Sequence, residues 1–300
     1  MKTLHKRNLH NDRYDFKELT KSNTSLEQYV SLNKYDDLSI DFFNADAVLA
    51  LNKALLSYFY NLEFWEIPKN YLCPPIPGRA DHIHYIADLL KESNRGTIPK
   101  GKAVKVLDIG VGANCIYPIV GNSIYGWSFT GSDIDEDAVN SAKDIVKNNK
   151  SLNSNVNILL QTSSDDIFKN IIQENDKYSL TICNPPFHKS KKEAIAGSKR
   201  KVNNLTKSKK RKANLNFGGQ NNELWCKGGE VVFITTMIKQ SEIYKNNSIW
   251  FTTLVSKKES LDTIYKELKK VNPTQIKTIN MSQGNKQSRI VAWSFQKDSK

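Results

Sequence analysis

Residues 103–113 read Ala-Val-Lys-Val-Leu-Asp-Ile-Gly-Val-Gly-Ala, an apolar run that ends in two closely spaced glycines. The run predicts a buried strand, and Gly110 and Gly112 predict a loop whose backbone approaches a ligand closely. A helix after this loop would present free N–H groups to that ligand. Ala113 replaces the third glycine of a dinucleotide fingerprint, which argues against a pyrophosphate and fits a nucleoside without phosphates. The stretch predicts a Rossmann-like α/β fold with Asp108 at the ligand.

A second strand is predicted at 127–132, and Asp133 follows it directly. Asp133 comes 25 positions after Asp108, where an acidic side chain can accept hydrogen bonds from both hydroxyls of a ribose. Gln161 and Ser163 follow the third predicted strand, at 156–160. They could reach an adenine ring, or they could form an ordinary polar loop.

A further strand, at 178–183, ends at Asn184-Pro185-Pro186-Phe187. Two prolines remove two backbone donors and end the ladder, so Asn184 lies at the carboxyl end of a strand, where open parallel sheets bind ligands. The Asn184 side-chain oxygen and the Pro185 carbonyl can each accept a hydrogen bond from a planar amine, while Phe187 stacks on the attached ring. The alternative is a proline-rich turn capped by a core phenylalanine. Polar residues at three successive strand ends favour the binding site over that turn and over a Rossmann-like domain for another ligand.

The formal net charge of +13 and the pI near 9.4 favour a polyanionic partner, either nucleic acid or an anionic membrane face. No apolar run approaches the length of a membrane span, and the chain opens on polar sequence instead of a signal peptide. We expect a soluble, cytoplasmic monomer that binds no membrane. The four cysteines lie far apart, and His82 and His84 point in different directions on a helix, so we also expect no metal.

The most basic segment is 189–212, in which eleven Lys and Arg residues oppose the single Glu193. Such a charge run is usually a solvated loop, and we expect it to be mobile. Its place directly after Phe187 favours a clamp on a nucleic-acid backbone. Residues 5–16, basic and aromatic, form either a solvated tail or an arm that contacts phosphates. The candidates for binding RNA are Lys6, Arg7, Arg13, Lys189, Lys191, Lys192, Lys199, Arg200, Lys201, Lys209, Lys210, Arg211 and Lys212.

Hydrophobic spacing divides the chain into an N-terminal, mostly helical extension at 1–100 and an α/β domain at 101–300 with a mobile basic loop at 189–214. The α/β domain is predicted as a seven-stranded, mostly parallel sheet with helices on both faces and an antiparallel last strand. Helices are predicted at 16–19, 25–32, 45–60 after the cap Asn44, 78–91, 137–149, 164–173, 230–244 and 258–270, and the last strands at 248–255, 275–281 and 289–295.

Seven stretches resemble the bacterial large-subunit (23S) ribosomal RNA adenine-N6 methyltransferase family RlmF. The resemblance covers nearly the whole chain, and it extends more weakly to the eukaryotic methyltransferase-like 16 family, which methylates adenosine in structured RNA. The stretches are 4–8 (LHKRN), 108–118 (DIGVGANCIYP), 183–188 (CNPPFH), 215–220 (LNFGGQ), 255–259 (VSKKE), 283–289 (QGNKQSR) and 291–295 (VAWSF).

The resemblance implies a class I methyltransferase that uses S-adenosylmethionine to methylate N6 of a specific adenosine in 23S ribosomal RNA. It implies that Gly110 and its neighbours contact the methionine part of the cofactor, Asp133 the ribose hydroxyls and Arg79 the methionine carboxylate. The catalytic motif matches residue for residue at Asn184, Pro185, Pro186 and Phe187. The basic loop and the N-terminal arm match only as basic regions.

Three other functions stay open at this point. A related class of enzymes uses Asn-Pro-Pro-Tyr to methylate glutamine in proteins, but Phe187 and the basic loop favour a nucleobase. A DNA adenine methyltransferase would share the motif. The chain could also be a non-catalytic RNA-binding protein on a methyltransferase frame, against which the glycines, Asp133 and Asn184 count.

Overall fold

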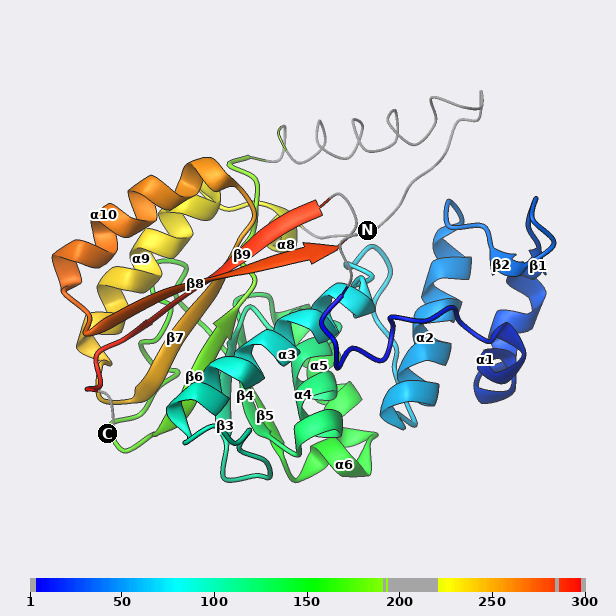
Figure 1. The fold of residues 1–300 in the computed structure, drawn as a ribbon, viewed down its shortest axis with the longest axis horizontal. Helices are drawn as coiled ribbons and strands as arrows, with labels where there is room; N and C mark the ends of the chain where they lie inside the picture. Colours follow the sequence, from blue (N-terminus) through cyan, green and yellow to red (C-terminus); the bar gives the residue numbers. More distant parts are fainter. Residues whose placement is uncertain (1–3, 191–192, 194–220, 284–285, 298–300) are drawn as a thin grey trace.

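The computed structural model describes residues 4–190, 193, 221–283 and 286–297. Its centre is a seven-stranded sheet in the order β5-β4-β3-β6-β7-β9-β8 (Figure 1). Strands β3 to β7 are mutually parallel, and β9 lies antiparallel between β7 and β8. The predicted mostly parallel sheet is therefore confirmed. Its strands are β3 (Lys105–Ile109), β4 (Ser128–Asp133), β5 (Val156–Leu160), β6 (Tyr178–Cys183), β7 (Ser248–Val255), β8 (Gln275–Gln283) and β9 (Lys286–Ser294).

The parallel strands bring three loops to one edge of the sheet. β3 pairs with β4 on one side and with β6 on the other, so that Asp108 lies opposite both Gly131 and Ile182. Because these strands run in the same direction, the residues that follow them emerge together. The chain changes direction across the sheet between β3 and β6, and ligands of open α/β sheets bind at such a point.

Two apolar cores cover opposite faces of the sheet. Successive residues of β3 alternate between them, since Val106 packs in one core and Leu107 in the other. Side chains of α3, α4 and α5 fill the first core, and those of α9 and α10 fill the second. Among the described residues, no helix is both long and apolar enough to cross a bilayer. The helices are α3 (Ile76–Ser93), α4 (Ile116–Tyr125), α5 (Glu136–Lys147), α6 (Lys150–Asn153), α8 (Asn221–Leu224), α9 (Gly229–Ile243), η2 (Lys258–Ser260) and α10 (Leu261–Val271).

The N-terminal elements pack against the first of these cores. α2 starts at the predicted cap, Asn44, whose side chain accepts hydrogen bonds from the N–H groups of Asp46 and Ala47. Leu55 of α2 belongs to the same apolar cluster as Val120 of α4. A domain boundary near residue 100 stays a prediction. These elements are α1 (Phe16–Ser22), η1 (Thr24–Tyr29), β1 (Val30–Leu32), β2 (Leu38–Ile40) and α2 (Ala45–Tyr60).

Two of the predicted helices are wrong. Residues 25–32 form part of η1 and then β1, which pairs with β2 in an antiparallel hairpin. Residues 164–173 form turns. There the N–H groups of Ile167 and Phe168 donate to the side-chain oxygen of Gln240 on α9, and Phe168 is buried. A contact with a distant helix replaces the local hydrogen bonds that a helix at 164–173 needs.

Candidate active site

The loop between β3 and α4 leaves bare backbone open on one side. Gly110 and Gly112 have φ values of +74° and +66°, in the left-handed region that favours glycine. The N–H groups of Gly110 and Val111 donate to the Ser132 carbonyl at 2.8 and 3.0 Å, which holds the loop against β4. A Cβ atom placed on Gly110 would meet nothing within 4 Å. A ligand can therefore approach the backbone there.

Asp108 is a buried carboxylate that lacks a partner. Its residue is 0% exposed, and neither carboxylate oxygen has a hydrogen-bond partner among the described residues. Burial raises the pKa of Asp108 well above its ordinary value; the charge of Asp133 raises it further, and that of Arg79 lowers it. A buried carboxylate without a donor is unfavourable. The ammonium group of S-adenosylmethionine would supply both donor and countercharge, so Asp108 fits this cofactor.

Asp133, after β4, already stabilises the glycine loop. Its carboxylate accepts hydrogen bonds from the N–H groups of Gly112 at 2.9 Å and Asp135 at 3.0 Å. Burial raises the pKa of Asp133, and these two hydrogen bonds oppose the rise. The carboxylate retains lone pairs for further donors such as ribose hydroxyls, and this contact stays a prediction. Asp135 caps α5, where it accepts from Asp137 and Ala138.

Asn184 follows β6 and emerges beside the glycine loop. Its side-chain oxygen is buried and has no hydrogen-bond partner in the part of the chain that the structure describes. Pro185 is buried, whereas Pro186 and Phe187 are half-buried. An acceptor without a protein donor, beside a partly open aromatic ring, suits a planar amine. Asn184 and Asp108 are thus two open acceptors on adjacent strands.

Gln161 and Ser163, after β5, organise their own loop. The Gln161 amide donates to the Lys169 carbonyl and accepts from the Ser163 N–H, both at 3.0 Å. The donor and the acceptor of this amide are thus both engaged inside the protein. A contact of either side chain with adenine stays a prediction.

A segment that the sequence analysis missed, residues 61–75 between α2 and α3, crosses the glycine loop. It connects that loop with the end of β4 and with α8, so it forms one wall of the site. Three aromatic residues in a proline-rich stretch were the signal available in the sequence. The hydrogen bonds run from Trp65 Nε1 to the Asn114 carbonyl at 2.9 Å, from the Tyr71 hydroxyl to Asp135 at 3.0 Å, and from the Leu72 N–H to Glu223 at 3.0 Å.

Residues 224–226 lie beside His188, directly after the Asn-Pro-Pro-Phe motif. His188 N–H donates to the Leu224 carbonyl at 3.0 Å, and Cys226 N–H donates to the His188 carbonyl at 3.1 Å. Lys189 is exposed, and its N–H donates to Glu193 at 2.8 Å. The chain therefore returns to the site as its glycine pairs suggest. The remaining basic candidates of this loop lie outside the described residues: Lys191, Lys192, Lys199, Arg200, Lys201, Lys209, Lys210, Arg211 and Lys212.

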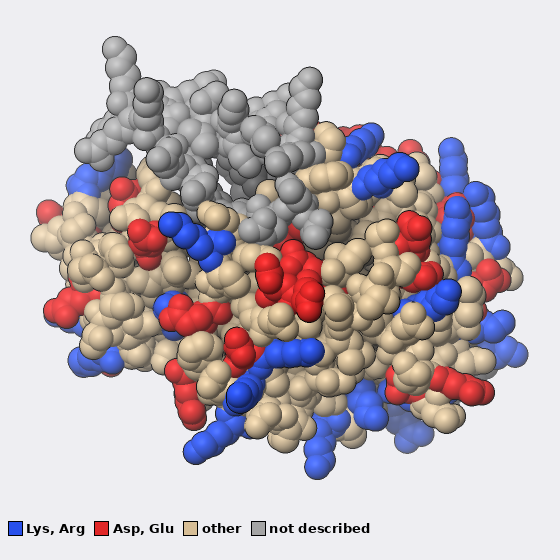
Figure 2. Space-filling view, turned by 180° about the vertical axis from the view of Figure 1, so that it is seen from behind, with Lys and Arg blue, Asp and Glu red and all other residues tan. Residues whose placement is uncertain are grey.

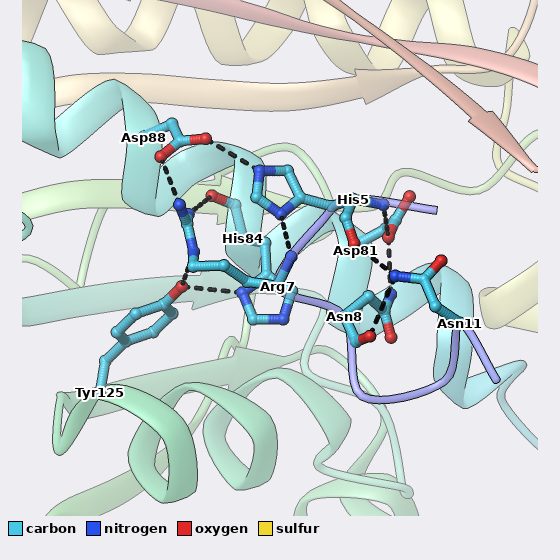
Figure 3. A network of polar contacts seen from close by, with 8 residues as sticks. All are labelled: His5, Arg7, Asn8, Asn11, Asp81, His84, Asp88 and Tyr125. Atoms are coloured by element: carbon cyan, nitrogen blue, oxygen red, sulfur yellow. Dashed lines mark hydrogen bonds and ion pairs between the residues drawn. The ribbon is translucent and has the colours of Figure 1, made fainter. Parts of the chain in front are cut away.

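Arg7 anchors the N-terminal arm to the rest of the protein (Figure 3). Its guanidinium donates to the Tyr125 hydroxyl at 3.1 Å and the His84 carbonyl at 2.9 Å, and it pairs with Asp88 at 2.9 Å. Burial lowers the pKa of Arg7, but the hydrogen bonds to Asp88 and Tyr125 raise it above its ordinary value. The arm is therefore docked, which favours a structural role for Arg7 over contact with RNA.

Lys6 and Arg13 are exposed cations of the same arm. Arg13 pairs with Asp37 at 2.9 Å, but its side chain is 86% exposed, so little free energy opposes its release. On the face shown in Figure 2, Asp and Glu side chains gather near the centre, and Lys and Arg lie mostly around them. This face is of mixed sign, whereas most of the surplus of positive charge falls at 189–212. Contacts of these residues with RNA stay predictions.

His82 and His84 each pair with a tyrosine of α4. His82 Nδ1 lies 2.9 Å from the Tyr117 hydroxyl, and His84 Nδ1 lies 2.7 Å from the Tyr125 hydroxyl. Burial lowers both pKa values to about 3, so both rings are neutral. Arg79, in the first turn of α3, donates to the Tyr117 hydroxyl at 3.4 Å. Within the described ranges, no group of three or more His, Cys, Asp and Glu side chains could hold a metal ion.

A family model described as RNA methyltransferase matches residues 1–297. The chain belongs to this family. Curated relatives named Ribosomal RNA large subunit methyltransferase F include one from Flavobacterium psychrophilum, 56% identical over 292 residues, which are 97% of this chain and 93% of the relative. Another, from Bacteroides fragilis, is 52% identical over an alignment of 299 positions that covers 97% of this chain and 98% of the relative. The resemblance seen in the motifs is confirmed.

Solved structures agree with the family. The hMettl16 catalytic domain in complex with MAT2A 3′UTR hairpin 1 matches with a TM-score of 0.83 and 28% identity over 99% of this chain and 97% of that one. The N-terminal domain of human METTL16 in complex with SAH matches with a TM-score of 0.76 and 26% identity over 99% and 100%. The chain is therefore an RNA methyltransferase of class I fold that uses S-adenosylmethionine.

Proposed function

We propose that this enzyme transfers the methyl group of S-adenosylmethionine to N6 of one adenosine in 23S ribosomal RNA. The observation that carries the proposal is the buried side-chain oxygen of Asn184, which has no donor among the described residues and supports a contact with an exocyclic amine. Relatives named large-subunit ribosomal RNA methyltransferases support the choice of RNA. We also propose that the enzyme acts as a monomer in the cytoplasm.

Adenine N6 is a poor nucleophile because its lone pair is delocalised into the ring. In the proposed complex the Asn184 side-chain oxygen and the Pro185 carbonyl each accept one N6 hydrogen, and Phe187 stacks on the base. These contacts favour a more tetrahedral nitrogen whose lone pair faces the methyl carbon. S-adenosylmethionine supplies an electrophilic methyl group on its sulfonium sulfur. Alignment of the two atoms provides much of the acceleration, and the amine proton leaves after transfer, so the motif needs no base.

Four groups hold the cofactor in this proposal. Asp108 accepts hydrogen bonds from its ammonium group, Asp133 from its ribose hydroxyls, and Arg79 pairs with its carboxylate. The bare backbone at Gly110 and Gly112 lies along its methionine part. The unpaired carboxylate of Asp108 and the open face of Gly110 support this arrangement.

The target adenine has to be unpaired or flipped out of its stack, at a cost of a few kcal/mol. Phosphate contacts from the basic segment 189–212 offset part of this cost. Lys189, exposed at the start of that segment, follows Phe187 by two positions in the sequence. The proposal therefore includes RNA binding that weakens steeply with added salt.

Large-subunit RNA from cells that lack the protein provides the test. The full chain is incubated with this RNA and methyl-labelled S-adenosylmethionine, and the nucleosides are then analysed. We expect a single N6-methyladenosine per RNA molecule. Labelled glutamine in protein, or labelled DNA in a competition between nucleic acids, would instead support the corresponding alternative. No transfer to naked RNA or to assembly intermediates, with cofactor binding intact, would overturn the proposal.

A further inference from the structure

Arg79, Tyr117 and His82 form a group at the cofactor end of α3 and α4. Arg79 donates to the Tyr117 hydroxyl at 3.4 Å, and its guanidinium carbon lies 5.6 Å from the centroid of the Tyr117 ring. The same hydroxyl lies 2.9 Å from His82 Nδ1. His82 is 0% exposed and Tyr117 is 3% exposed. None of the ion pairs within the described residues involves Arg79.

The hydrogen bond between Arg79 and Tyr117 has one possible direction. A guanidinium can only donate, so the Tyr117 oxygen accepts from Arg79. Burial and the charge of Arg79 lower the pKa of His82 to about 3, so this ring is neutral, and its tautomer decides whether Nδ1 donates to the hydroxyl or accepts from it. In either case the Tyr117 hydroxyl is held between Arg79 and His82. One lone pair of this hydroxyl and the face of the Tyr117 ring hold the Arg79 guanidinium.

We propose that Tyr117 and His82 are positioning residues that aim Arg79 at the α-carboxylate of the cofactor. The inference rests on the proposed contact of Arg79 with that carboxylate. Arg79 lies close enough to Asp108 for the two charges to interact, and Asp108 is the acceptor for the ammonium group. One carbon separates the ammonium from the carboxylate, so the two protein groups have to be fixed relative to each other. β3 fixes Asp108, while Tyr117 and His82 remove the rotamer freedom of Arg79.

The chain contains a matched control on the same two helices, at the middle of α3 and the last residue of α4. Arg7 donates to the Tyr125 hydroxyl at 3.1 Å, and that hydroxyl lies 2.7 Å from His84 Nδ1 (Figure 3). This second arginine–tyrosine–histidine group has the same chemistry but faces the N-terminal arm, where Arg7 pairs with Asp88. Tyr125→Phe therefore removes the same kind of hydroxyl away from the cofactor.

The test measures the dissociation constants of two ligands by calorimetry with the full chain. One is S-adenosylmethionine, and the other is decarboxylated S-adenosylmethionine, which lacks only the carboxylate. The ratio of the two constants reports how well the carboxylate is held. We expect Tyr117→Phe to reduce the preference for the carboxylate about tenfold, since a hydrogen bond that orders a charged group is lost, and Tyr125→Phe to keep it within about twofold. His82→Phe and His84→Phe form a second pair with the same expectation.

Thermal unfolding first establishes that each variant is folded at the temperature of the measurement. Equal weakening of both ligands, or an unchanged preference in Tyr117→Phe and His82→Phe, would overturn the inference. Arg79→Ala distinguishes this failure from a failure of the proposed contact. If Arg79→Ala keeps the preference for the carboxylate, the contact itself is wrong. If Arg79→Ala alone loses it, the contact stands and the positioning role of Tyr117 and His82 is wrong.

Discussion

The two arginine–tyrosine–histidine groups between α3 and α4 differ in the groups around them. At the arm, Arg7 pairs with Asp88, and Asp88 also accepts from His5 at 2.9 Å. At the sheet edge, Arg79 lies near Asp108, whose two oxygens have no hydrogen-bond partner among the described residues. In both groups the histidine Nε2 is buried without a hydrogen-bond partner among the described residues, so the two groups differ in their carboxylates: Asp88 is paired and Asp108 is not.

The difference lies in the carboxylates. Asp88 is paired with His5 and Arg7, which favours a structural role, whereas the lack of a partner for Asp108 among the described residues supports its proposed role in binding a ligand. In the arm, polar side chains complete one another, and their contacts stabilise the docked chain. Asp108 and Asn184 instead carry buried acceptors that have no hydrogen-bond partner among the described residues, each at a cost of about 1–3 kcal/mol. A ligand that brings the missing donors removes this cost, which supports the proposal that both residues contact a ligand.

The largest expected effect is on kcat, and it compares two asparagines. The side-chain oxygen of Asn184 has no hydrogen-bond partner among the described residues, whereas the side chain of Asn122, near the end of α4, is hydrogen-bonded within the protein. Asn184→Ala removes an acceptor for the amine, so we expect kcat to fall about a hundredfold, while the free energy of unfolding is unchanged or rises by up to about 1–3 kcal/mol because a buried acceptor without a donor is removed. Asn122 is buried and donates to the Trp127 carbonyl at 2.9 Å. Asn122→Ala should lower the free energy of unfolding by about 1–3 kcal/mol and leave kcat within about twofold. Single-turnover methylation and urea unfolding measure both quantities, and near-normal activity of Asn184→Ala would remove Asn184 from the site.

The next effect compares the two carboxylates, Asp108 and Asp88. Asp108→Asn removes a buried unpaired charge, so we expect the free energy of unfolding without cofactor to rise by about 1–3 kcal/mol and the affinity for S-adenosylmethionine to fall by about 10- to 100-fold. Asp88 is 36% exposed and paired with His5 and Arg7. Asp88→Asn should therefore cost less than about 1 kcal/mol and leave the affinity within about twofold. If Asp108→Asn were less stable than the wild type, the contrast between an unpaired Asp108 and a paired Asp88 would be wrong.

Most of the sheet can be predicted from local patterns. β5 and β7 occupy the residues predicted for them, and α2 follows the predicted cap Asn44, because apolar runs and caps are properties of neighbouring residues. The helix predicted at 164–173 is absent because Gln240, 73 positions from Ile167, supplies the hydrogen bond at that site. The sequence near residue 167 does not indicate that Gln240 will be its hydrogen-bond partner.

The residues of the candidate site also divide into those that local sequence patterns predict and those that depend on distant partners. The polar residues at the strand ends can be placed together from sequence alone, because parallel strands end at one edge. Arg79 comes from a helix outside that pattern, and only the family resemblance indicated it. His82 and Tyr117 lie on two different helices and are 35 positions apart in the sequence. The spacing of the histidines argued against a metal site but did not indicate this pairing. Charge alone suggested RNA contact for Arg7, since no pattern shows that Asp88 lies beside it.

The smallest expected effect is the pH dependence of stability, which has opposite signs for the two carboxyls. Burial raises the pKa of Asp108 above its ordinary value of 3.8, so its contribution to stability is present below that value and is lost as the pH rises through the raised pKa. Burial also acts to raise the pKa of Asp88, but hydrogen bonds from His5 and Arg7 lower it overall. The contribution of Asp88 is therefore present above 3.8 and is lost as the pH falls through the lowered pKa.

Urea unfolding of the two asparagine variants across the acid range measures this difference. The advantage of Asp108→Asn over the wild type should grow as the pH rises from about 4 to about 7, by at most about 1.4 kcal/mol per pH unit, whereas the deficit of Asp88→Asn should shrink only below about pH 4. The buried neutral histidines, His82 and His84, also destabilise the folded chain in acid. The effect of His82 is common to both variants, but the charge of Asp88 raises the pKa of His84, so Asp88→Asn adds to the destabilisation that His84 causes in acid. In the same range the affinity of the wild type for S-adenosylmethionine should decrease as the pH is lowered, because the ammonium group needs an ionised Asp108. The affinity of Asp108→Asn should not change with pH. If the free energy of unfolding changed with pH in the same way in both variants, the two carboxyls would have equivalent surroundings. The distinction between an unpaired Asp108 and a paired Asp88 would then be wrong.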